Sequence, residues 1–227
     1  MLRGVTLEVP DGVTTVVIGP SGCGKTVLLK HIVGLMRPNE GKIIIDRAEI
    51  STLYGRELFK IRERMSVVFQ GSALLDSLTV AENITLGLRE RTKLRESELN
   101  EIVKEKLEMV KLEGTENLMP AEISGGMKKR VAIARALATD PKYILYDEPT
   151  TALDPVTANK IDELICGLQG KLKITAIVVT HDLTSAYKVG DKIAMLKKGE
   201  IIFEGTPEEI RNCKEQKVKE FVRGRIL

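Results

Sequence analysis

The chain has 227 residues, of which 43% are hydrophobic and 30% are charged, and its formal net charge is +3. This composition can bury a globular core, and it excludes a disordered or low-complexity chain. The surface has mixed charge, aromatic residues make up only 4% and tryptophan is absent. No basic stripe or stacking platform is visible, so we expect no nucleic-acid partner.

The apolar runs have the length of strands, such as ITAIVV at residues 174–179. They fall short of the roughly 18 residues that cross a bilayer, and no signal peptide is visible, so we expect a cytosolic protein. Cys23, Cys166 and Cys213 have no CxxC spacing, which supports neither a disulfide framework nor a zinc site.

The first elements surround a glycine-rich loop. Residues 7–18 form an alternating stretch, a turn at Asp11 and Gly12, and then an apolar strand over 13–18. GPSGCGKT follows at 19–26, and residues 27–35 predict a helix. The octapeptide fits G-x-x-x-x-G-K-[ST], a loop whose backbone N–H groups cradle the phosphates of a nucleoside triphosphate.

Each part of this loop has a predicted task. Lys25 would place its charge on the β- and γ-phosphates, and Thr26 would offer its hydroxyl to Mg²⁺. Cys23 could have a lowered thiol pKa here, but we interpret it as structural. The predicted phosphate-binding residues are Gly19, Pro20, Ser21, Gly22, Cys23, Gly24, Lys25, Thr26 and Val27.

The next elements lead into a helical segment. A loop is expected at 37–41, a strand at 42–46, a short helix at 55–64 and a strand at 65–70 that ends in Gln70. In residues 71–123 the periodicity becomes helical and charge is dense, with the apolar positions Leu99, Ile102, Val103, Leu107 and Val110. We therefore expect a helical lobe inserted into an α/β core.

Strands and helices alternate again in the second half. The expected elements are a helix at 125–138, a strand at 143–147, a helix at 155–168, a strand at 174–180, a helix at 183–189, a hairpin at 192–204 that turns at Lys198 and Gly199, and a helix at 207–227. Fully apolar strands that alternate with helices favour a mainly parallel sheet covered on both faces. The predicted fold class is an α/β P-loop NTPase core, with an antiparallel β portion near the N-terminus.

Polar residues gather where the predicted strands end. Asp147 closes one strand and would lie near Mg²⁺, and Glu148 follows it, where it could accept a proton from an attacking water. Gln70 closes a second strand, and His181 lies just past the end of a third. Because ligands collect at the carboxyl ends of parallel strands, these residues predict a catalytic rim.

A second anion site is predicted at ISGGMKKR, residues 123–130. Ser124, Gly125 and Gly126 precede or open a helix, where free backbone N–H groups bind anions. One triphosphate rarely needs two such sites in one chain, whereas a second copy of the chain would use one. A kinase would need an acceptor pocket instead, and a small GTPase would need an N-K-x-D segment, which is not found.

These ordered motifs resemble the nucleotide-binding subunit of ABC transporters over nearly the whole chain. The motifs are GPSGCGKT, Gln70, ISGGM, YILYDE, ALDP at 152–155 and His181. The resemblance implies one domain over 1–227, with a nucleotide-binding core at 1–70 and 124–206, a helical lobe at 71–123 and a C-terminal helix at 207–227.

The resemblance also implies a mechanism. Two chains would sandwich two ATP molecules with Mg²⁺ head to tail, each between residues 19–27 of one chain and Ser124 to Gly126 of the other. Glu148 would be the general base, His181 would contact the γ-phosphate, and Asp154 would bridge the subunits. Lys25 and Gln70 complete the catalytic set, and Thr26, Gln70 and Asp147 the metal set. Gln70 would also sense an integral-membrane permease, which would hold the chain at the cytoplasmic face of the inner membrane.

Shorter segments point to a subfamily. QGSALLDSL at 70–78, SGGM in place of SGGQ, and KVKEFVRG at 217–224 look like the ATPases of Mla/Mce-type lipid transporters, which implies an MCE-domain protein as a further partner. RVAIARAL at 130–137 also resembles polar amino acid importers. A soluble ABC ATPase acting on DNA or ribosomes is a third alternative, although its usual coiled coils or second cassette are not found.

Three features depart from the family pattern or stay open. Met127 replaces the signature glutamine, and ATP binding should survive through the backbone of Gly125 and Gly126. No aromatic precedes Tyr54, so either aliphatic contacts hold the adenine or the natural chain starts upstream. The last helix is rich in Lys and Arg, which favours a solvated face over contact with a partner subunit or anionic lipid.

Overall fold

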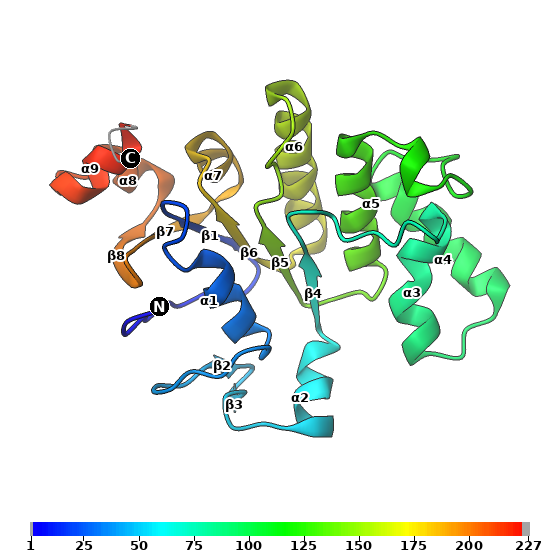
Figure 1. Ribbon diagram of the computed structural model, residues 1–227, viewed down its shortest axis with the longest axis horizontal. Helices are drawn as coiled ribbons and strands as arrows, with labels where there is room; N and C mark the ends of the chain where they lie inside the picture. The colour runs from blue at the N-terminus through cyan, green and yellow to red at the C-terminus, as the bar shows by residue number, and fades with distance from the viewer. Residues whose placement is uncertain (1, 224–227) are drawn as a thin grey trace.

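The computed structural model describes residues 2–223 and centres on a six-stranded sheet with the order β4-β5-β6-β1-β7-β8 (Figure 1). The strands are β1 Thr14–Ile18, β4 Met65–Val68, β5 Tyr143–Asp147, β6 Thr175–Thr180, β7 Lys192–Lys197 and β8 Glu200–Gly205. All neighbours pair in parallel except β7 and β8, which form the hairpin that the turn at Lys198 predicts. The structure thus confirms the mainly parallel sheet.

The sheet brings the predicted site residues to one edge. Ile18 pairs with Thr180, Asp147 with Val179 and Val68 with Tyr146, so β1, β6, β5 and β4 end side by side. β1 is fully buried over its five residues because both faces of a parallel strand are covered. Functional side chains that follow these strands therefore meet at one rim.

Two hydrophobic clusters cover the two faces of the sheet. One contains Leu28 and Leu29 of α1 (Lys25–Ile32), against which Val5, Leu7 and Val9 of the first segment also pack. Those three residues alternate as a strand would, yet they are not part of a strand. The other cluster contains buried side chains of α5 (Gly125–Leu137), α6 (Pro155–Leu172) and α7 (Leu183–Val189).

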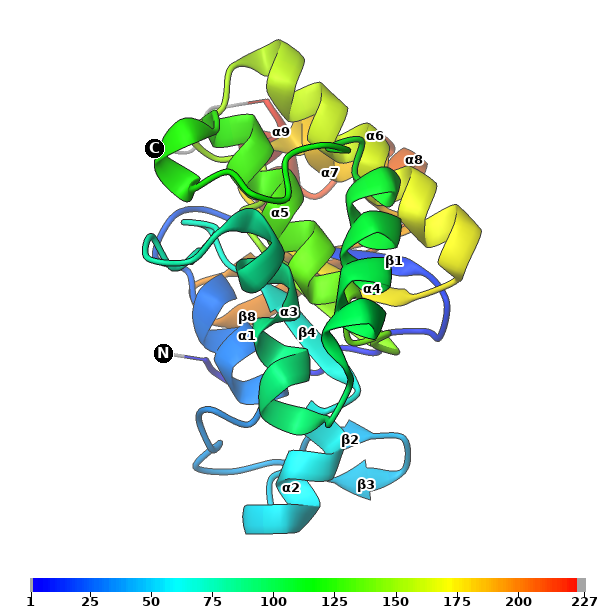
Figure 2. The same ribbon diagram turned by 90° about the vertical axis from the view of Figure 1, so that its right-hand side faces the viewer.

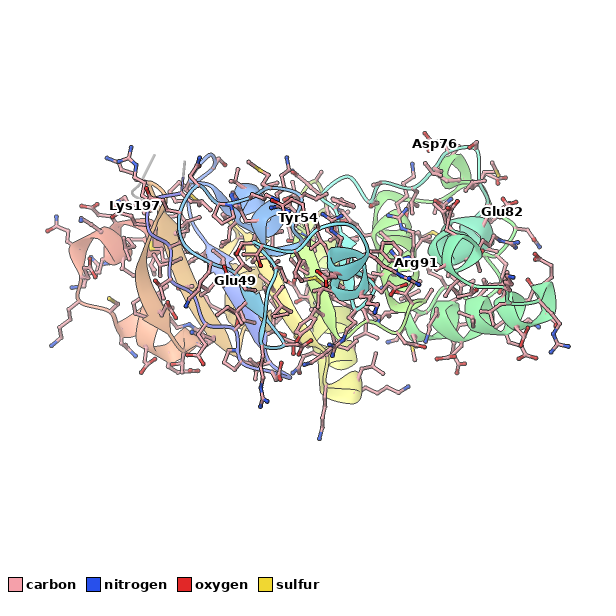
Figure 3. The ribbon with its side chains drawn as sticks, turned by 90° about the horizontal axis from the view of Figure 1, so that it is seen from below. Glu49, Tyr54, Asp76, Glu82, Arg91 and Lys197 are labelled. Atoms are coloured by element: carbon pink, nitrogen blue, oxygen red, sulfur yellow. The ribbon has the colours of Figure 1, made fainter. Side chains whose placement is uncertain are left out.

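The helical lobe lies at one end of the molecule. It contains α3 (Val80–Arg91), α4 (Glu96–Met109) and the short 3₁₀ helix η1 (Pro120–Glu122). Thr79 and Glu82 begin α3 with a reciprocal capping box. Figure 3 shows Asp76 and Glu82 on this lobe and Lys197 at the far end of the molecule. α5 packs against α3, α4 and β4, and so joins the lobe to the sheet (Figure 2).

Several predicted elements differ in the structure. β4 ends at Val68 rather than at Gln70, and α6 continues to Leu172 rather than ending at residue 168. α1 begins at Lys25 rather than at residue 27, because the helix starts directly after Gly24. The strand expected at 42–46 is only β2 (Ile44–Ile45), which pairs with β3 (Ala48–Glu49) in a separate antiparallel hairpin. Its one strand partner among the described residues, β3, is also only two residues long. α2 (Gly55–Arg62) follows as predicted.

The C-terminal helix expected at 207–227 is two helices, α8 (Pro207–Asn212) and α9 (Gln216–Val222), and residues 224–227 lie outside the described part. Ile210 and Val218 are both buried in the same core cluster. In one straight helix Val218 would lie about 12 Å beyond Ile210 along the axis. The break at 213–215 therefore lets both side chains reach one core.

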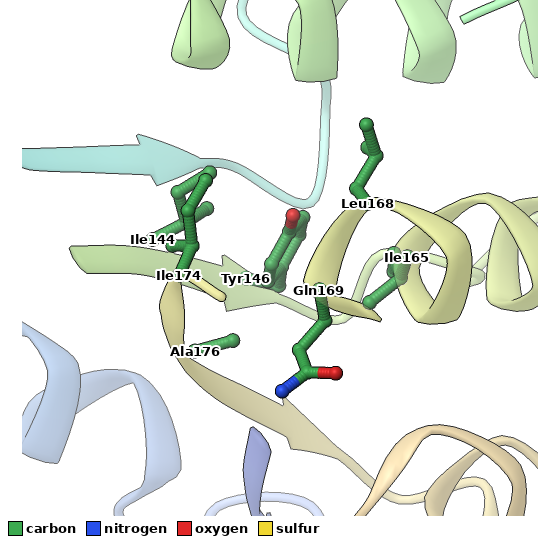
Figure 4. Close-up of a pocket in the computed structure, with 7 residues that line it drawn as sticks. All are labelled: Ile144, Tyr146, Ile165, Leu168, Gln169, Ile174 and Ala176. Atoms are coloured by element: carbon green, nitrogen blue, oxygen red, sulfur yellow. The ribbon is translucent and has the colours of Figure 1, made fainter. Parts of the chain in front are cut away.

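A small cavity of about 10 Å³ lies between β5, β6 and α6 (Figure 4). Its lining is almost entirely apolar, with Ile144, Tyr146, Ile165 and Leu168 among the residues that Figure 4 labels. This volume is about the least that one water molecule needs, and a site with few polar partners does not hold water well. The cavity is a packing defect.

No helix within residues 2–223 is both long and apolar enough to cross a bilayer.

Candidate nucleotide-binding site

The glycine-rich loop joins β1 to α1 as predicted and passes very close to β7. A Cβ on Gly19 would lie 2.1 Å from the carbonyl oxygen of Leu196 and 2.8 Å from Cys23 Sγ. Real Cβ atoms do not approach backbone this closely, so glycine is required at position 19. Gly22 and Gly24 have φ values of 76° and 115°, which glycine adopts without strain.

The N-terminus of α1 offers free N–H groups to an anion. Gly24 is its N-cap and has no side chain that could cap the N–H groups of the first turn, which also contains no acidic residue. The first N–H groups of a helix have no partner within the helix, and the helix dipole adds positive potential there. This geometry fits the phosphate cradle that the motif predicts.

Lys25 lies at the centre of the loop. Its Nζ donates to the carbonyl oxygens of Gly19 at 2.8 Å and Pro20 at 3.3 Å, and it lies 3.5 Å from Glu148 Oε1. Only 7% of the side chain is exposed, which leaves the ammonium group weakly screened by water. A triphosphate in the loop would therefore meet a fixed and partly desolvated positive charge.

Glu148 connects two strand ends. The residue has a φ of 48°, in the left-handed region, and it directly follows β5. Its Oε2 lies 2.8 Å from His181 Nδ1 and accepts from Thr151 Oγ1 at 3.2 Å and Thr180 Oγ1 at 3.3 Å. A carboxylate only accepts hydrogen bonds, which assigns a proton to Nδ1 of His181. More than half of the His181 side chain is exposed, so the ring can reach a ligand.

Thr26 and Asp147, two of the three predicted metal ligands, are in contact. Thr26 Oγ1 donates to Asp147 Oδ1 at 3.2 Å. Burial raises the pKa of the Asp147 carboxyl, and Glu148 adds to this, while the Thr26 hydrogen bond and Lys25 act against it. No group of three or more His, Cys, Asp or Glu within the described residues could hold a metal. Mg²⁺ does not need one, since it commonly binds one or two protein groups besides phosphates and waters. The pair therefore fits Mg²⁺.

Gln70 is placed two residues past the end of β4, and its side chain is exposed. In the described part of the chain this side chain makes no hydrogen bond to Thr26 or Asp147, so the three predicted metal ligands are not all in contact. Its backbone carbonyl oxygen accepts a hydrogen bond from Lys129 Nζ.

Lys129 is a residue that the sequence analysis missed. It projects from α5 and is 5% exposed. Its ammonium group interacts electrostatically with the carboxylates of Asp147 and Glu148. Burial lowers the pKa of its ammonium group, and the two carboxylates oppose that shift. The spacing of 59 residues to Gln70 gives no sequence signal. The one hint in the sequence was that Lys129 lies on a face of the predicted helix that is otherwise apolar.

The predicted second anion site opens α5. Ser124 is the N-cap and its hydroxyl accepts from the Met127 N–H at 3.3 Å. A Cβ on Gly126 would lie 2.5 Å from Thr157 Cγ2, so any larger residue there would force the Thr157 side chain of α6 to move. A Cβ on Gly125 would meet only Leu153 at an ordinary 3.7 Å, so packing in this chain does not require that glycine.

Asp154 serves as the N-cap of α6. Its Oδ1 accepts from the N–H groups of Val156 and Thr157, both at 3.0 Å, and these hydrogen bonds lower the pKa of the carboxyl.

Cys23 is buried, and burial raises the pKa of its thiol, although the charge of Lys25 acts to lower it. This favours the structural interpretation of Cys23 over a reactive thiol.

Within one chain the two predicted anion sites are separate. Throughout residues 2–223, no hydrogen bond or ion pair joins Ser124, Gly125 or Gly126 to residues 19–27. The loop, Thr26, Asp147, Glu148 and His181 do meet at one rim. Such a P-loop with a carboxylate pair on a mainly parallel sheet defines a nucleotide-binding ATPase cassette.

Comparison with known proteins gives the family. Residues 2–151 match the family model described as "ABC transporter". The chain belongs to the ABC transporter family, in which it is an ATP-binding cassette of the ABC ATPase class. This confirms the resemblance, the fold class and the class of enzyme inferred from the sequence.

Two curated relatives cover nearly all of this chain. The "Probable ribonucleotide transport ATP-binding protein mkl" of Mycobacterium leprae is 42% identical over 98% of this chain and 64% of its own length. The "Intermembrane phospholipid transport system ATP-binding protein MlaF" of Haemophilus influenzae is 40% identical over 97% of this chain and 83% of its own length. The chain thus spans slightly less than two thirds of the mycobacterial relative.

Solved structures agree with the fold. The "ATP-binding cassette MJ0796 bound to ADP and Pi", described as dimeric, is 40% identical with a TM-score of 0.82, over 91% of this chain and 90% of that one. The cbiO1 protein of Clostridium perfringens, described as part of an ABC transporter complex, is 32% identical with a TM-score of 0.86, over 98% and 88%.

Proposed function

We propose that this chain is the ATP-hydrolysing subunit of a membrane transporter and that it hydrolyses ATP as a head-to-tail dimer. The observation that carries this proposal is the division of the site. Residues 19–27 meet Asp147, Glu148 and His181 at one rim, whereas Ser124 to Gly126 form no hydrogen bond or ion pair with them within residues 2–223. A second copy would supply the missing half. The dimeric cassette among the similar structures supports this arrangement.

Each rim residue has a proposed role. Lys25 and the N-terminus of α1 hold the phosphates, and Glu148 removes a proton from the attacking water. His181, fixed by its contact with Glu148, would contact the γ-phosphate through its exposed ring. Lys25, Glu148 and His181 thus converge on one reacting group.

Thr26 and Asp147 would hold Mg²⁺, and Gln70 would join them when its exposed side chain turns inward. When bound, Mg²⁺ neutralises charge that develops on the phosphates. Burial raises the pKa of the Asp147 carboxyl and thereby disfavours its charged form. A cation beside the carboxyl would act in the opposite direction and favour the charged form.

Two surface features support the dimer. Val156 is 65% exposed although it lies next to Asp154, the residue proposed to bridge the subunits. Gly125 is exposed and has no side chain, so a phosphate can approach its backbone. Both features lie beside the half of the site that needs a partner chain.

The proposed cargo is a phospholipid or another apolar molecule. It rests on the MlaF name and on the segments that resemble Mla/Mce-type ATPases. The partners would be a membrane permease and an MCE-domain protein, with this chain at the cytoplasmic face of the inner membrane. The mkl name favours ribonucleotides as a second candidate cargo.

The catalytic proposal is tested with Glu148→Gln. The amide cannot accept a proton from water, so kcat should fall by at least about 100-fold while ATP still binds and dimer accumulates. Glu200→Gln, which removes an exposed carboxylate outside the site, is the matched control and should keep the parent rate. Turnover of Glu148→Gln at the parent rate would refute the general-base role.

The cargo is tested by purifying the chain with its membrane partner. Mass spectrometry of the bound small molecules should find phospholipid, and adding phospholipid should stimulate ATP hydrolysis. Enrichment of ribonucleotides other than the hydrolysed ATP would support the second candidate. Co-purification with ribosomes or DNA and without a permease would contradict the transporter proposal.

A further inference from the structure

A groove of about 470 Å³ lies on the side of α6 that faces the C-terminal end of α4 and the middle of α5. Its size falls in the range of small-molecule sites. The lining residues are Met109, Lys111, Arg130, Lys160, Glu163, Leu164, Gly167, Leu168 and Lys171. The three helices can be followed in Figure 2. The proposed catalytic residues are not among the lining residues, so the groove is separate from the nucleotide site.

The wall formed by α6 is a single helical stripe. Lys160, Leu164, Gly167 and Lys171 recur every three or four residues, which places them on one face of the helix. Lys160 and Lys171 stand eleven residues apart, roughly 17 Å along the axis. Leu164 and Leu168 give the floor of this stripe apolar surface.

The groove is strongly positive. Lys111, Arg130, Lys160 and Lys171 take part in no ion pair within the described residues. The single acidic lining residue, Glu163, is already paired with Lys188 at 3.1 Å. Low-dielectric walls around like charges concentrate the field in a cleft.

The opposite wall is held in place from α4. Arg130 Nη1 donates to the carbonyl oxygen of Val110 at 3.0 Å, which is its one hydrogen bond in the described part of the chain. The remaining guanidinium N–H groups can serve a ligand in the fork geometry that suits carboxylates and phosphates. Lys111 is fixed in the left-handed region with a φ of 57°, directly beside this contact.

Gly167 leaves the middle of the groove open. A Cβ at this position would meet nothing within 4 Å. Glycine inside a helix is destabilising by roughly 1 kcal/mol relative to alanine, and no contact within residues 2–223 explains it here. The open space above Gly167 lies between the basic rim and the apolar floor.

We propose that this groove binds a single-chain amphiphilic anion. Because Lys160 and Lys171 stand roughly 17 Å apart, a phosphate or carboxylate headgroup would pair with only some of the four cations at a time, and the apolar body would lie along Leu164, Gly167 and Leu168. This site goes beyond the proposed transport function and does not depend on it.

The test is calorimetric titration of the full chain with dodecyl phosphate and, separately, dodecanoate, below their micelle concentrations and with ADP and Mg²⁺ saturating. At least one should bind with 1:1 stoichiometry. Inorganic phosphate and uncharged dodecyl maltoside should each bind at least 10-fold more weakly. Which of the two anions binds more tightly identifies the headgroup. Equal binding of dodecyl maltoside, or no saturable binding of either anion, would overturn the proposal.

The location is tested by Gly167→Phe, whose Cβ would meet nothing within 4 Å and whose ring would occupy space in the groove. Gly170→Phe is the matched control, because a Cβ at Gly170 also meets nothing within 4 Å but Gly170 does not line the groove. Gly167→Phe should weaken binding at least 10-fold and Gly170→Phe should not. Equal affinity in both variants would refute the site.

A second variant avoids any dependence on packing. Lys160→Gln with Lys171→Gln removes two exposed cations that make no ion pair in the described residues, so the fold should be unchanged by circular dichroism. Affinity for the anion should fall at least 5-fold, and dodecyl maltoside should be unaffected. An unchanged affinity would contradict the electrostatic part of the proposal.

Discussion

Gly19 shows how a single residue can serve the fold and the site together. It lets the loop pass against Leu196 of β7, and the carbonyl oxygen of Gly19 accepts from Lys25. The same close approach therefore fixes both the start of the loop and the position of the ammonium group. The motif predicted a glycine for phosphate binding, and the structure adds a packing reason for it.

Gly19→Ala is expected to destabilise the protein and to weaken ATP binding. The new Cβ would conflict with backbone that cannot move away easily, which should lower the free energy of unfolding by about 2 kcal/mol or more. Denaturant titration and nucleotide binding measure the two effects. Gly22→Ala is the comparison, because its Cβ meets nothing within 4 Å and only its φ of 76° is unfavourable. Equal stability of Gly19→Ala and the parent would contradict the packing argument.

Lys129 extends the site beyond the residues that the motifs name. Its buried ammonium group joins α5 to the segment that begins at Gln70, and it lies within electrostatic reach of Asp147 and Glu148. Lys129 is thus a positioning residue, which acts through Gln70 and the two carboxylates.

Lys129→Met should lower kcat by about 10-fold and leave KM for ATP nearly unchanged, because the residue does not line the phosphate loop. Replacing a buried charge with an apolar side chain of similar length should keep the free energy of unfolding within about 1 kcal/mol of the parent. The same measurements on Lys128→Met, one residue earlier on α5, provide the control. A large loss of stability together with unchanged kcat would show a purely structural role.

At the scale of elements, α8 and α9 explain why the chain after residue 206 is not one helix. Ile210 and Val218 are 1% and 0% exposed and belong to the same core cluster, although α8 and α9 are separate helices. Charge pattern alone predicted a continuous basic helix, because Lys and Arg dominate its composition. Two buried apolar side chains outweigh that pattern.

Val218→Ala should lower the free energy of unfolding by about 2 kcal/mol, since it removes fully buried methyl groups and leaves a cavity. Lys217→Ala changes the exposed neighbour and should alter stability by less than about 0.5 kcal/mol. Chemical denaturation of both variants checks this. Equal stability of the two would show that α9 is not docked on the core.

At the scale of the whole molecule, the main consequence is a site shared between two chains. Residues 19–27 lie at the rim of the sheet, while Ser124 begins a helix that packs on the helical lobe. If each site takes residues 19–27 from one chain and Ser124 to Gly126 from the other, two inactive variants can restore activity when they form a mixed dimer.

Lys25→Ala and Ser124→Arg should each be inactive alone. A mixed dimer would contain one site with both defects and one site with neither, so an equimolar mixture should recover about a quarter of the parent ATPase rate if the two sites act independently. Mixing each variant with the parent chain measures how completely the subunits exchange. Persistent inactivity of the mixture despite exchange would place the whole site within one chain.

The sequence by itself determined the strands and the residues at their ends. Continuous apolar strands, the spacing of GPSGCGKT and the polar residues Asp147, Glu148 and His181 follow from local chemistry, so the sheet and its rim could be predicted. Helix ends were less certain, because α1 begins at Lys25 through the conformation of Gly24.

Only the tertiary structure decided contacts between distant segments. The hydrogen bond from Lys129 to Gln70, the two helices after residue 206 and the basic groove beside α6 depend on residues that are far apart in the chain. Local patterns report which face of an element is apolar, whereas they carry no information on which other element covers it. That choice follows from packing of the whole chain.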